Sequence, residues 1–139
     1  MDTINLLAAM DENYLPQLSV MLTSAVLNNP ETRFDLYLLH HNIPDGMMES
    51  VDLWSSLTGN GFFPIQVRDE LFQDAPVSRQ YPREMYYRLL APRLLPENLD
   101  RILYLDSDIL ALNPLRPLWD IDLQGKTFAA SSHTGVLDL

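Results

Sequence analysis

The chain has 139 residues, a length typical of one domain, and its composition of 47% hydrophobic and 20% charged residues is that of a folded globular protein. Nine basic residues against 19 acidic ones give a formal net charge of −10, which repels nucleic-acid phosphates and anionic membrane surfaces and disfavours both as partners. The lack of cysteine excludes disulfides, thiolate metal sites and cysteine nucleophiles.

Three features of the sequence favour a cytoplasmic protein. A chain without cysteine suits a reducing compartment. No apolar stretch approaches the ~18 residues of a membrane-spanning helix, so no transmembrane segment is predicted. The first residues carry no basic region ahead of their short apolar run, which is unlike a secretory signal peptide.

The first half of the chain predicts strands and helices in alternation. An apolar run over residues 4–9 is typical of a buried strand. Apolar residues then recur at helical spacing from Leu15 to Leu27, with Pro16 in the first turn of this helix and Pro30 beyond its end. The next predicted elements are a strand over 34–39, a helix over 47–57 and, after a Gly-Asn-Gly turn, a strand over 62–67.

Prolines divide the second half into shorter segments. A polar connection that contains Pro76 and Pro82 predicts a loop. A helical pattern follows until Pro92 and Pro96 interrupt it. The elements predicted here are the helix over 85–91, a strand over 101–105, an extended apolar stretch over 109–112 and a strand edge over 128–132.

Alternating strands and helices indicate an α/β fold, a Rossmann-like domain in which helices cover both faces of a mainly parallel sheet. Ligands of such sheets bind outside the carboxyl ends of the strands, and Asp11 and Asp106 both fall there. Doubly wound domains normally contain more strands than these, so the sequence predicts a truncated domain.

The acidic step Asp106-Ser107-Asp108 directly follows the most strand-like run in the chain. Two carboxylates one residue apart in extended chain project to the same side, so they can share one cation. Carboxylate oxygens suit Mg²⁺ or Mn²⁺, and these ions complete their coordination with water and phosphate oxygens. The alternative interpretation is an acidic pair that caps a turn, since short motifs of this kind often arise without a metal.

This segment carries a resemblance to a known family. Residues 101–110 resemble the metal-binding DxD segment of family 8 glycosyltransferases, and residues 94–100 resemble the family's approach to that strand. The similarity continues through 114–123, and residues 9–14 resemble the family's first nucleotide-binding loop. The resemblance implies a retaining, lipopolysaccharide galactosyl- or glucosyltransferase-like enzyme with the GT-A fold, whose nucleotide-sugar-binding part would occupy residues 1–139.

By that resemblance, the residues at the end of the first strand bind uridine. Ala9, Asp11, Asn13 and Tyr14 would line the pocket, with Asp11 accepting a hydrogen bond from the base and Tyr14 offering an aromatic surface. The local alternative is that Asp11 or Asn13 caps the following helix and that Tyr14 simply packs.

The resemblance assigns the remaining site residues to the diphosphate and the sugar. Asp106 and Asp108 would bind Mn²⁺ or Mg²⁺. Independently of the resemblance, Ser107 has no His-Asp relay in the sequence to make it a nucleophile, so we expect it to be a small residue that allows the ligand close approach. Arg88 would face the donor, where its planar guanidinium suits phosphate or sugar oxygens. The alternative for Arg88 is an ion pair with Glu84 on the same helix.

The predicted reaction is metal-dependent transfer of a hexose from a UDP-sugar to a hydroxyl of a carbohydrate or glycolipid acceptor, with retention at the anomeric carbon as the resemblance implies. No nucleophile or base is assigned. The family's third metal ligand is a His in a C-terminal motif that this sequence lacks, and His40, His41 and His133 do not match it. We therefore expect these histidines to be structural or solvent-facing.

Two alternatives remain open from the sequence. One is a noncatalytic nucleotide-binding or scaffolding remnant of such a transferase. The other is a phosphotransferase of the haloacid dehalogenase type, in which the first Asp of a DxD motif is phosphorylated and the second acts as acid and base. That motif ordinarily follows the first strand, whereas Asp106 lies late in the chain.

Overall fold

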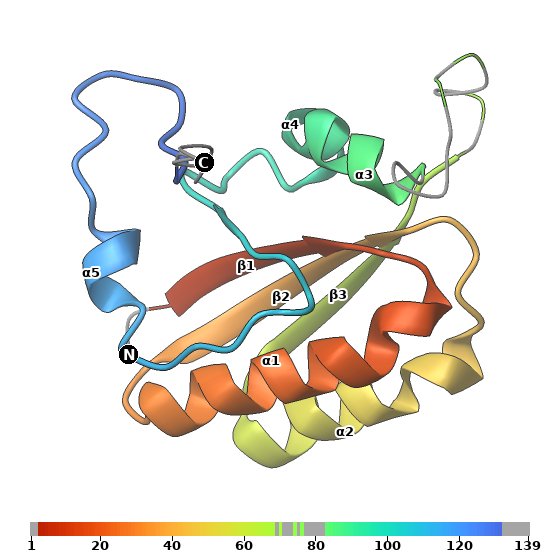
Figure 1. Cartoon of the computed structure of the whole chain (residues 1–139), viewed down its shortest axis with the longest axis horizontal. Helices are drawn as coiled ribbons and strands as arrows, with labels where there is room; N and C mark the ends of the chain where they lie inside the picture. Colours follow the sequence, from red (N-terminus) through yellow and green to blue (C-terminus); the bar gives the residue numbers. More distant parts are fainter. Residues whose placement is uncertain (1–2, 69, 71–73, 75, 77–82, 132–139) are drawn as a thin grey trace, which may run out of the picture.

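The computed structural model describes residues 3–68, 70, 74, 76 and 83–131, and these form a parallel four-stranded sheet with the strand order β3-β2-β1-β4 (Figure 1). The first three strands pair over their whole lengths, whereas β4 pairs with β1 only through Leu103 and Tyr104. The strands are β1 (Thr3–Ala9), β2 (Arg33–His40), β3 (Gly61–Gln66) and β4 (Leu103–Tyr104).

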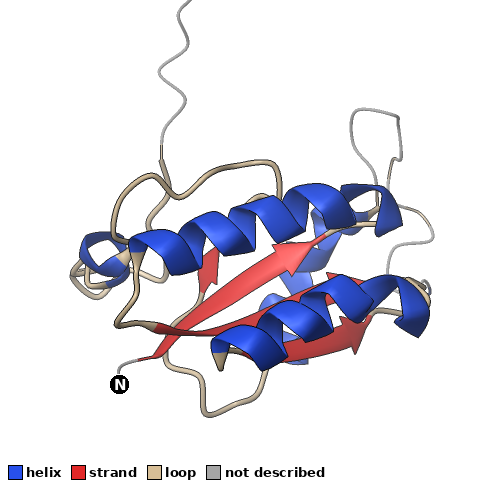
Figure 2. Ribbon diagram, turned by 90° about the horizontal axis from the view of Figure 1, so that it is seen from below, coloured by secondary structure: helices blue, strands red, loops and turns tan. Residues whose placement is uncertain are grey.

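Helices lie on both faces of this sheet, so the predicted α/β layering is confirmed. The long helices α1 and α2 lie side by side on one face, and the short elements α3 and α4 lie on the other (Figures 1 and 2). None of the helices in the described part is long and apolar enough to cross a bilayer. The helical elements are η1 (Glu12–Tyr14), α1 (Leu15–Asn28), η2 (Asp45–Met48), α2 (Glu49–Thr58), α3 (Glu84–Tyr87), η4 (Arg88–Leu90), α4 (Ala91–Leu94) and α5 (Arg116–Trp119).

Strand alternation divides the core into two clusters. On β1, Leu6 and Ala8 face α1 and α2, while Leu7 between them faces α3 and α4. Successive side chains of a strand point to opposite faces, and both faces here are covered, so the middle of β1 and β2 is apolar on both sides, whereas polar residues such as Asn5 and Asp35 lie nearer the strand starts. The larger cluster is centred on Ile4, Leu6, Leu18, Leu22, Phe34, Leu36 and Val51, and the smaller one on Leu7, Tyr37, Leu39, Val67 and Tyr87.

The helix α1 forms where its sequence predicts. Pro16 lies in the first turn, where a missing N–H costs nothing, and the helix ends before Pro30. Its apolar stripe is narrower than the sequence suggests, because Val20 and Leu27 are 57% and 75% exposed. Hydrophobicity alone therefore predicts more core residues in this helix than the structure contains.

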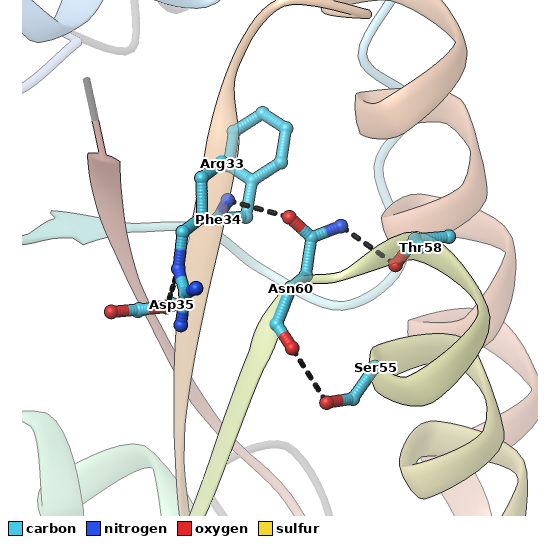
Figure 3. A network of polar contacts seen from close by, with 6 residues as sticks. All are labelled: Arg33, Phe34, Asp35, Ser55, Thr58 and Asn60. Atoms are coloured by element: carbon cyan, nitrogen blue, oxygen red, sulfur yellow. Dashed lines mark hydrogen bonds and ion pairs between the residues drawn. The ribbon is translucent and has the colours of Figure 1, made fainter. Parts of the chain in front are cut away.

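A side-chain network pins the start of β3 against β2 (Figure 3). Gly59 ends α2 with a φ of +71°, a conformation that glycine adopts without strain. The next residue, Asn60, accepts a hydrogen bond from the Phe34 N–H at 2.7 Å and donates one to the Thr58 hydroxyl at 2.8 Å. The Ser55 hydroxyl donates to the Asn60 carbonyl at 2.6 Å. Asn60 is thus hydrogen-bonded both to β2 and to the last turns of α2.

Predictions for the second half of the chain are partly wrong. No strand forms over the described residues 128–131, and the predicted strand over 101–105 shrinks to two residues, while the apolar stretch over 109–112 joins no strand of the sheet. Pro92 does not interrupt the helical segment but occupies the first turn of α4, which runs on to Leu94. Most of the predicted loop around Pro76 and Pro82 lies outside the described residues.

Candidate functional site

An open hollow of about 200 Å³ lies beyond the carboxyl ends of β1 and β4. The chain leaves β1 toward β2 on one side, while β4 lies on the other, so this is where the strand order reverses. Open α/β sheets bind ligands at such a point because the connections diverge and leave a crevice. The hollow is lined by Ala9, Met10, Asp11, Tyr14, Glu84, Tyr104, Asp106, Ser107 and Asp108.

The wall that follows β1 is held by the backbone and by Asp11. The Met10 N–H donates to the Leu39 carbonyl at 3.3 Å and continues the β1–β2 ladder past the last strand residue. One oxygen of the Asp11 carboxylate accepts the Asn13 N–H at 2.9 Å and so caps the short helix η1. The cap fixes the direction of the Asp11 side chain and places Tyr14, which is 43% exposed, on the rim of the hollow.

The wall that follows β4 carries the acidic pair. The Leu105 N–H donates to the Leu7 carbonyl at 3.1 Å, and the carboxylates of Asp106 and Asp108 are exposed beyond it. The Tyr104 hydroxyl donates to one oxygen of Asp106 at 3.0 Å. Burial and then the Asp106 carboxylate raise the pKa of this hydroxyl, so it stays protonated at neutral pH and remains a donor.

Charge in and beside the hollow is unevenly distributed. Its lining contains the carboxylates of Asp11, Glu84, Asp106 and Asp108. The guanidinium of Arg88 lies over the Tyr104 ring, 5.4 Å from its centroid, just outside the lining. A polyphosphate entering a hollow with four carboxylates is repelled unless a cation is bound between them.

The structure brings together most of the residues predicted for the site. Ala9, Asp11, Tyr14 and the triplet 106–108 share the hollow. Asn13 and Arg88 contact residues of its lining without being part of it themselves.

Three lining residues were not predicted for the site, namely Met10, Glu84 and Tyr104. Tyr104 precedes Asp106 by two residues in extended chain, so strand alternation could have placed both on one side. Glu84 carries no comparable signal, because only the packing of α3 over the sheet brings it to the edge.

The described histidines make backbone contacts away from the hollow. Nδ1 of the buried His40 accepts the Ile43 N–H at 3.1 Å, and Nδ1 of His41 lies 3.2 Å from the Val67 carbonyl. Burial lowers the pKa of His40, outweighing the opposite effect of Asp45, so its neutral form is favoured. His133 lies outside the described residues. Within the described residues, no three His, Cys, Asp or Glu side chains are grouped to hold a metal ion.

Comparison with known proteins shows which family shares this sequence. Residues 5–136 match the sequence profile described as glycosyl transferase family 8. The chain belongs to this family. Its membership leaves no support for the haloacid dehalogenase interpretation, and the acidic pair indeed follows β4 rather than β1.

Two bacterial relatives illustrate the family. The lipopolysaccharide 1,2-glucosyltransferase of Escherichia coli K12 is 30% identical over 128 residues, which are 92% of this chain and 38% of the relative. General stress protein A of Bacillus subtilis is 26% identical over 136 residues, covering 96% of this chain and 48% of the relative. The chain thus spans less than half the length of these family 8 relatives.

Solved structures agree with the sequence comparison. The galactosyltransferase LgtC, determined in complex with donor and acceptor sugar analogs, superposes with a TM-score of 0.77 at 29% identity, covering 86% of this chain and 43% of LgtC. The fold of this family 8 chain is therefore the GT-A fold, as its sequence implied.

Proposed function

We propose that the protein transfers a hexose from a UDP-sugar to a hydroxyl of a carbohydrate or glycolipid acceptor, in a metal-dependent reaction that retains the anomeric configuration. One observation carries the proposal: the carboxylates of Asp106 and Asp108 share a single hollow with Asp11 and Tyr14, at the switch point of the sheet. The acidic pair on one wall would bind the metal-diphosphate end of a nucleoside diphosphate, and Asp11 and Tyr14 on the other wall would bind its base. The family and the bound donor analog of LgtC support a nucleotide-sugar donor.

The chemistry of the hollow fits a divalent cation. Two exposed carboxylates one residue apart form a hard oxygen donor set, which suits Mn²⁺ or Mg²⁺ and leaves positions for phosphate oxygens. Asp106 and Asp108 would hold the ion. When bound, it would neutralise the negative charge that develops on the departing diphosphate.

The chain's own residues would bind and orient the donor. Asp11 would accept a hydrogen bond from the uracil ring, and Tyr14 would pack against it. Tyr104 would fix one oxygen of Asp106 through its hydroxyl, and the small side chain of Ser107 would let the diphosphate approach the turn. Arg88, which lies over the Tyr104 ring, would offer positive charge beside the diphosphate or the sugar.

In the proposed transfer, the bond between the anomeric carbon and the diphosphate oxygen breaks, and UDP leaves with the electron pair. The acceptor hydroxyl oxygen forms the new bond to the same carbon, and its proton passes to the departing diphosphate or to solvent. We assign no residue of this chain as nucleophile or base. The acceptor class rests on the relative named a lipopolysaccharide glucosyltransferase.

Replacing either acidic ligand tests the proposal. Asp106→Asn and Asp108→Asn should each lower the affinity for UDP in the presence of Mn²⁺ at least tenfold, or by about 1.4 kcal/mol, while leaving the unfolding temperature unchanged. Isothermal titration calorimetry with and without EDTA measures this. Asp52→Asn, on the exposed surface of α2, is the matched control. Unaltered Mn²⁺-dependent binding in both site variants would refute the metal assignment.

A transfer assay separates the enzyme from a noncatalytic remnant. Radiolabelled UDP-glucose and UDP-galactose are offered to the full-length protein with oligosaccharide or glycolipid acceptors. The proposal predicts labelled product that requires Mn²⁺ and is lost in Asp106→Asn. Tight UDP binding without transfer to any acceptor would favour the scaffolding alternative.

A further inference from the structure

The segment that follows the acidic pair is held by the side chains of a helix. Residues 105–115 run across the α1 face of the sheet toward the C-terminal end of that helix (Figure 1). No strand forms here, so the backbone groups of this segment need partners other than a ladder. The partners are two polar residues in the last turns of α1, Ser24 and Asn28, and the C-cap residue Asn29.

Both backbone groups of Ala111 are bound by this helix. The Ala111 N–H donates to the Ser24 hydroxyl oxygen at 2.9 Å, and the Ala111 carbonyl accepts from the Asn28 amide at 2.8 Å. The arrangement satisfies Ala111 as a neighbouring strand would, and its side chain is buried. In a third hydrogen bond, the Leu115 N–H donates to the Asn29 side-chain oxygen at 2.7 Å and fixes the chain four residues further on.

These side chains are themselves oriented by α1. The Ser24 hydroxyl donates to the Met21 carbonyl at 2.7 Å, and the Asn28 amide also donates to the Ser24 carbonyl at 3.0 Å. These bonds within α1 fix the orientation of the Ser24 and Asn28 side chains independently of their contacts with Ala111. Asn29, which is buried, donates in addition to the Ala25 carbonyl at 2.7 Å.

The turn that carries Asp106 and Asp108, called the acidic turn below, lies between two points at which the backbone is hydrogen-bonded to the rest of the fold. On one side, the Leu105 N–H is bound to the Leu7 carbonyl of β1, and on the other Ala111 is bound to α1. Asp108 is three residues from Ala111, a distance that extended chain spans in at most ~11 Å. Fixing Ala111 consequently restricts the positions that the Asp108 carboxylate can reach relative to Asp106.

We propose that Ser24 and Asn28 are positioning residues for the metal-binding turn, acting through the backbone of Ala111 to hold Asp108 beside Asp106. The inference rests on the proposed function, in that it assumes the acidic pair binds the cation. Neither side chain lines the hollow, so any effect on metal binding passes through the turn. The same helix begins next to Asp11 and Tyr14, so one rigid element joins the two walls of the hollow.

The test compares Ser24→Ala and the double variant Ser24→Ala/Asn28→Ala with wild type in the full-length protein. Calorimetry measures the affinity for UDP with Mn²⁺ and for uridine without metal. The double variant should bind UDP with Mn²⁺ about tenfold more weakly, as expected for groups that orient a ligand, with uridine affinity changed less than about twofold. Ser24→Thr keeps the hydroxyl oxygen, so its affinity for UDP with Mn²⁺ should match that of wild type rather than that of Ser24→Ala.

Thr23→Ala is the matched control, because the Thr23 hydroxyl bonds to a carbonyl of the same helix and does not reach the turn. A purely structural role would give the Ser24 and Thr23 variants similar thermal shifts and the same Mn²⁺-dependent affinity as wild type, which would overturn the inference. Wild type that binds UDP equally with and without Mn²⁺ would instead remove the proposed function, and the inference with it.

Amide hydrogen exchange provides a readout that needs no ligand. In wild type, the Ala111 amide should be protected, and Ser24→Ala should accelerate its exchange without affecting amides of β2. Unchanged protection of Ala111 in a folded Ser24→Ala variant would contradict the inference even if metal affinity fell.

Discussion

Residues 3–67 and residues 83–131 share one binding hollow but are built in different ways. The first region contains strands of seven, eight and six residues and two helices of 14 and ten residues, and it supplies most of the buried apolar side chains described. The second contains a two-residue strand and helices of four residues. It adds Tyr87, Ala91, Leu105 and Ala111 to the buried apolar side chains, and both regions expose large apolar ones, such as Leu27 at 75% and Leu112 at 73%.

The difference separates the part that contributes most to the stability of the fold from the part that carries the acidic pair Asp106 and Asp108. Long ladders of hydrogen bonds and the larger apolar cluster fix the first region. The second region packs on the smaller cluster through Tyr87 and Ala91, and its acidic segment is fixed by single contacts, such as α1 side chains to Ala111. Short segments held by a few directional bonds can place two carboxylates accurately while contributing little to the core.

The largest expected effect contrasts one leucine from each region. Leu36→Ala, in the middle of β2 and fully buried, should destabilise the protein by about 2–5 kcal/mol, since it removes transfer free energy and leaves a cavity. Leu112→Ala should change the free energy of unfolding by less than about 0.5 kcal/mol, because that side chain is exposed. Urea unfolding measures both. Similar losses in the two variants would show that the regions do not differ in this way.

A second prediction concerns the contact that orients Asp106 within the second region. Tyr104→Phe removes the hydroxyl that donates to the carboxylate and should weaken Mn²⁺-dependent UDP binding about tenfold with little change in stability. Tyr86→Phe is the control, because the Tyr86 hydroxyl bonds to the Pro76 carbonyl away from the hollow. If both variants bind as wild type does, the Tyr104 hydroxyl has no positioning role.

A third, smaller effect probes the wall contributed by the first region. Asp11→Ala should weaken uridine binding about two- to tenfold, the value of one hydrogen bond, and remove the η1 cap. Asp11→Ser keeps a capping oxygen on a shorter side chain, so it should preserve stability and still lose base affinity. Competition among UDP, ADP and GDP provides the measurement. Wild type with no preference for UDP would show that the uridine pocket is misassigned.

Prediction from sequence succeeded where the first region's construction is periodic. Apolar alternation and runs locate β1, β2 and α1 because most residues of these elements that enter the core are themselves apolar. It could not show what residues 109–112 contact, because an apolar run indicates extended structure and no more. The hydrogen bonds that fix the course of this segment join Ala111 to Asn28 and Ser24, which lie 83 and 87 positions earlier in the chain. No local sequence pattern reveals such bonds.

The candidate site follows the same division. Asp11, Asp106 and Asp108 stand directly after apolar strands, so their place at the sheet edge could be predicted. The positions of Arg88 over Tyr104 and of Glu84 in the lining depend on how α3 and η4 pack, which a four-residue helix does not encode in its periodicity.

The most direct test of the account is to locate the cation by nuclear magnetic resonance. Substoichiometric Mn²⁺ is added to isotope-labelled protein with UDP, with Mg²⁺ as the diamagnetic reference. Paramagnetic broadening should be strongest for the amides of Asp106, Ser107 and Asp108, extend to Asp11 across the hollow, and spare Asp52 on α2. Broadening centred on any other acidic cluster, or none near residues 106–108, would contradict the claim that this pair holds the metal against the nucleotide.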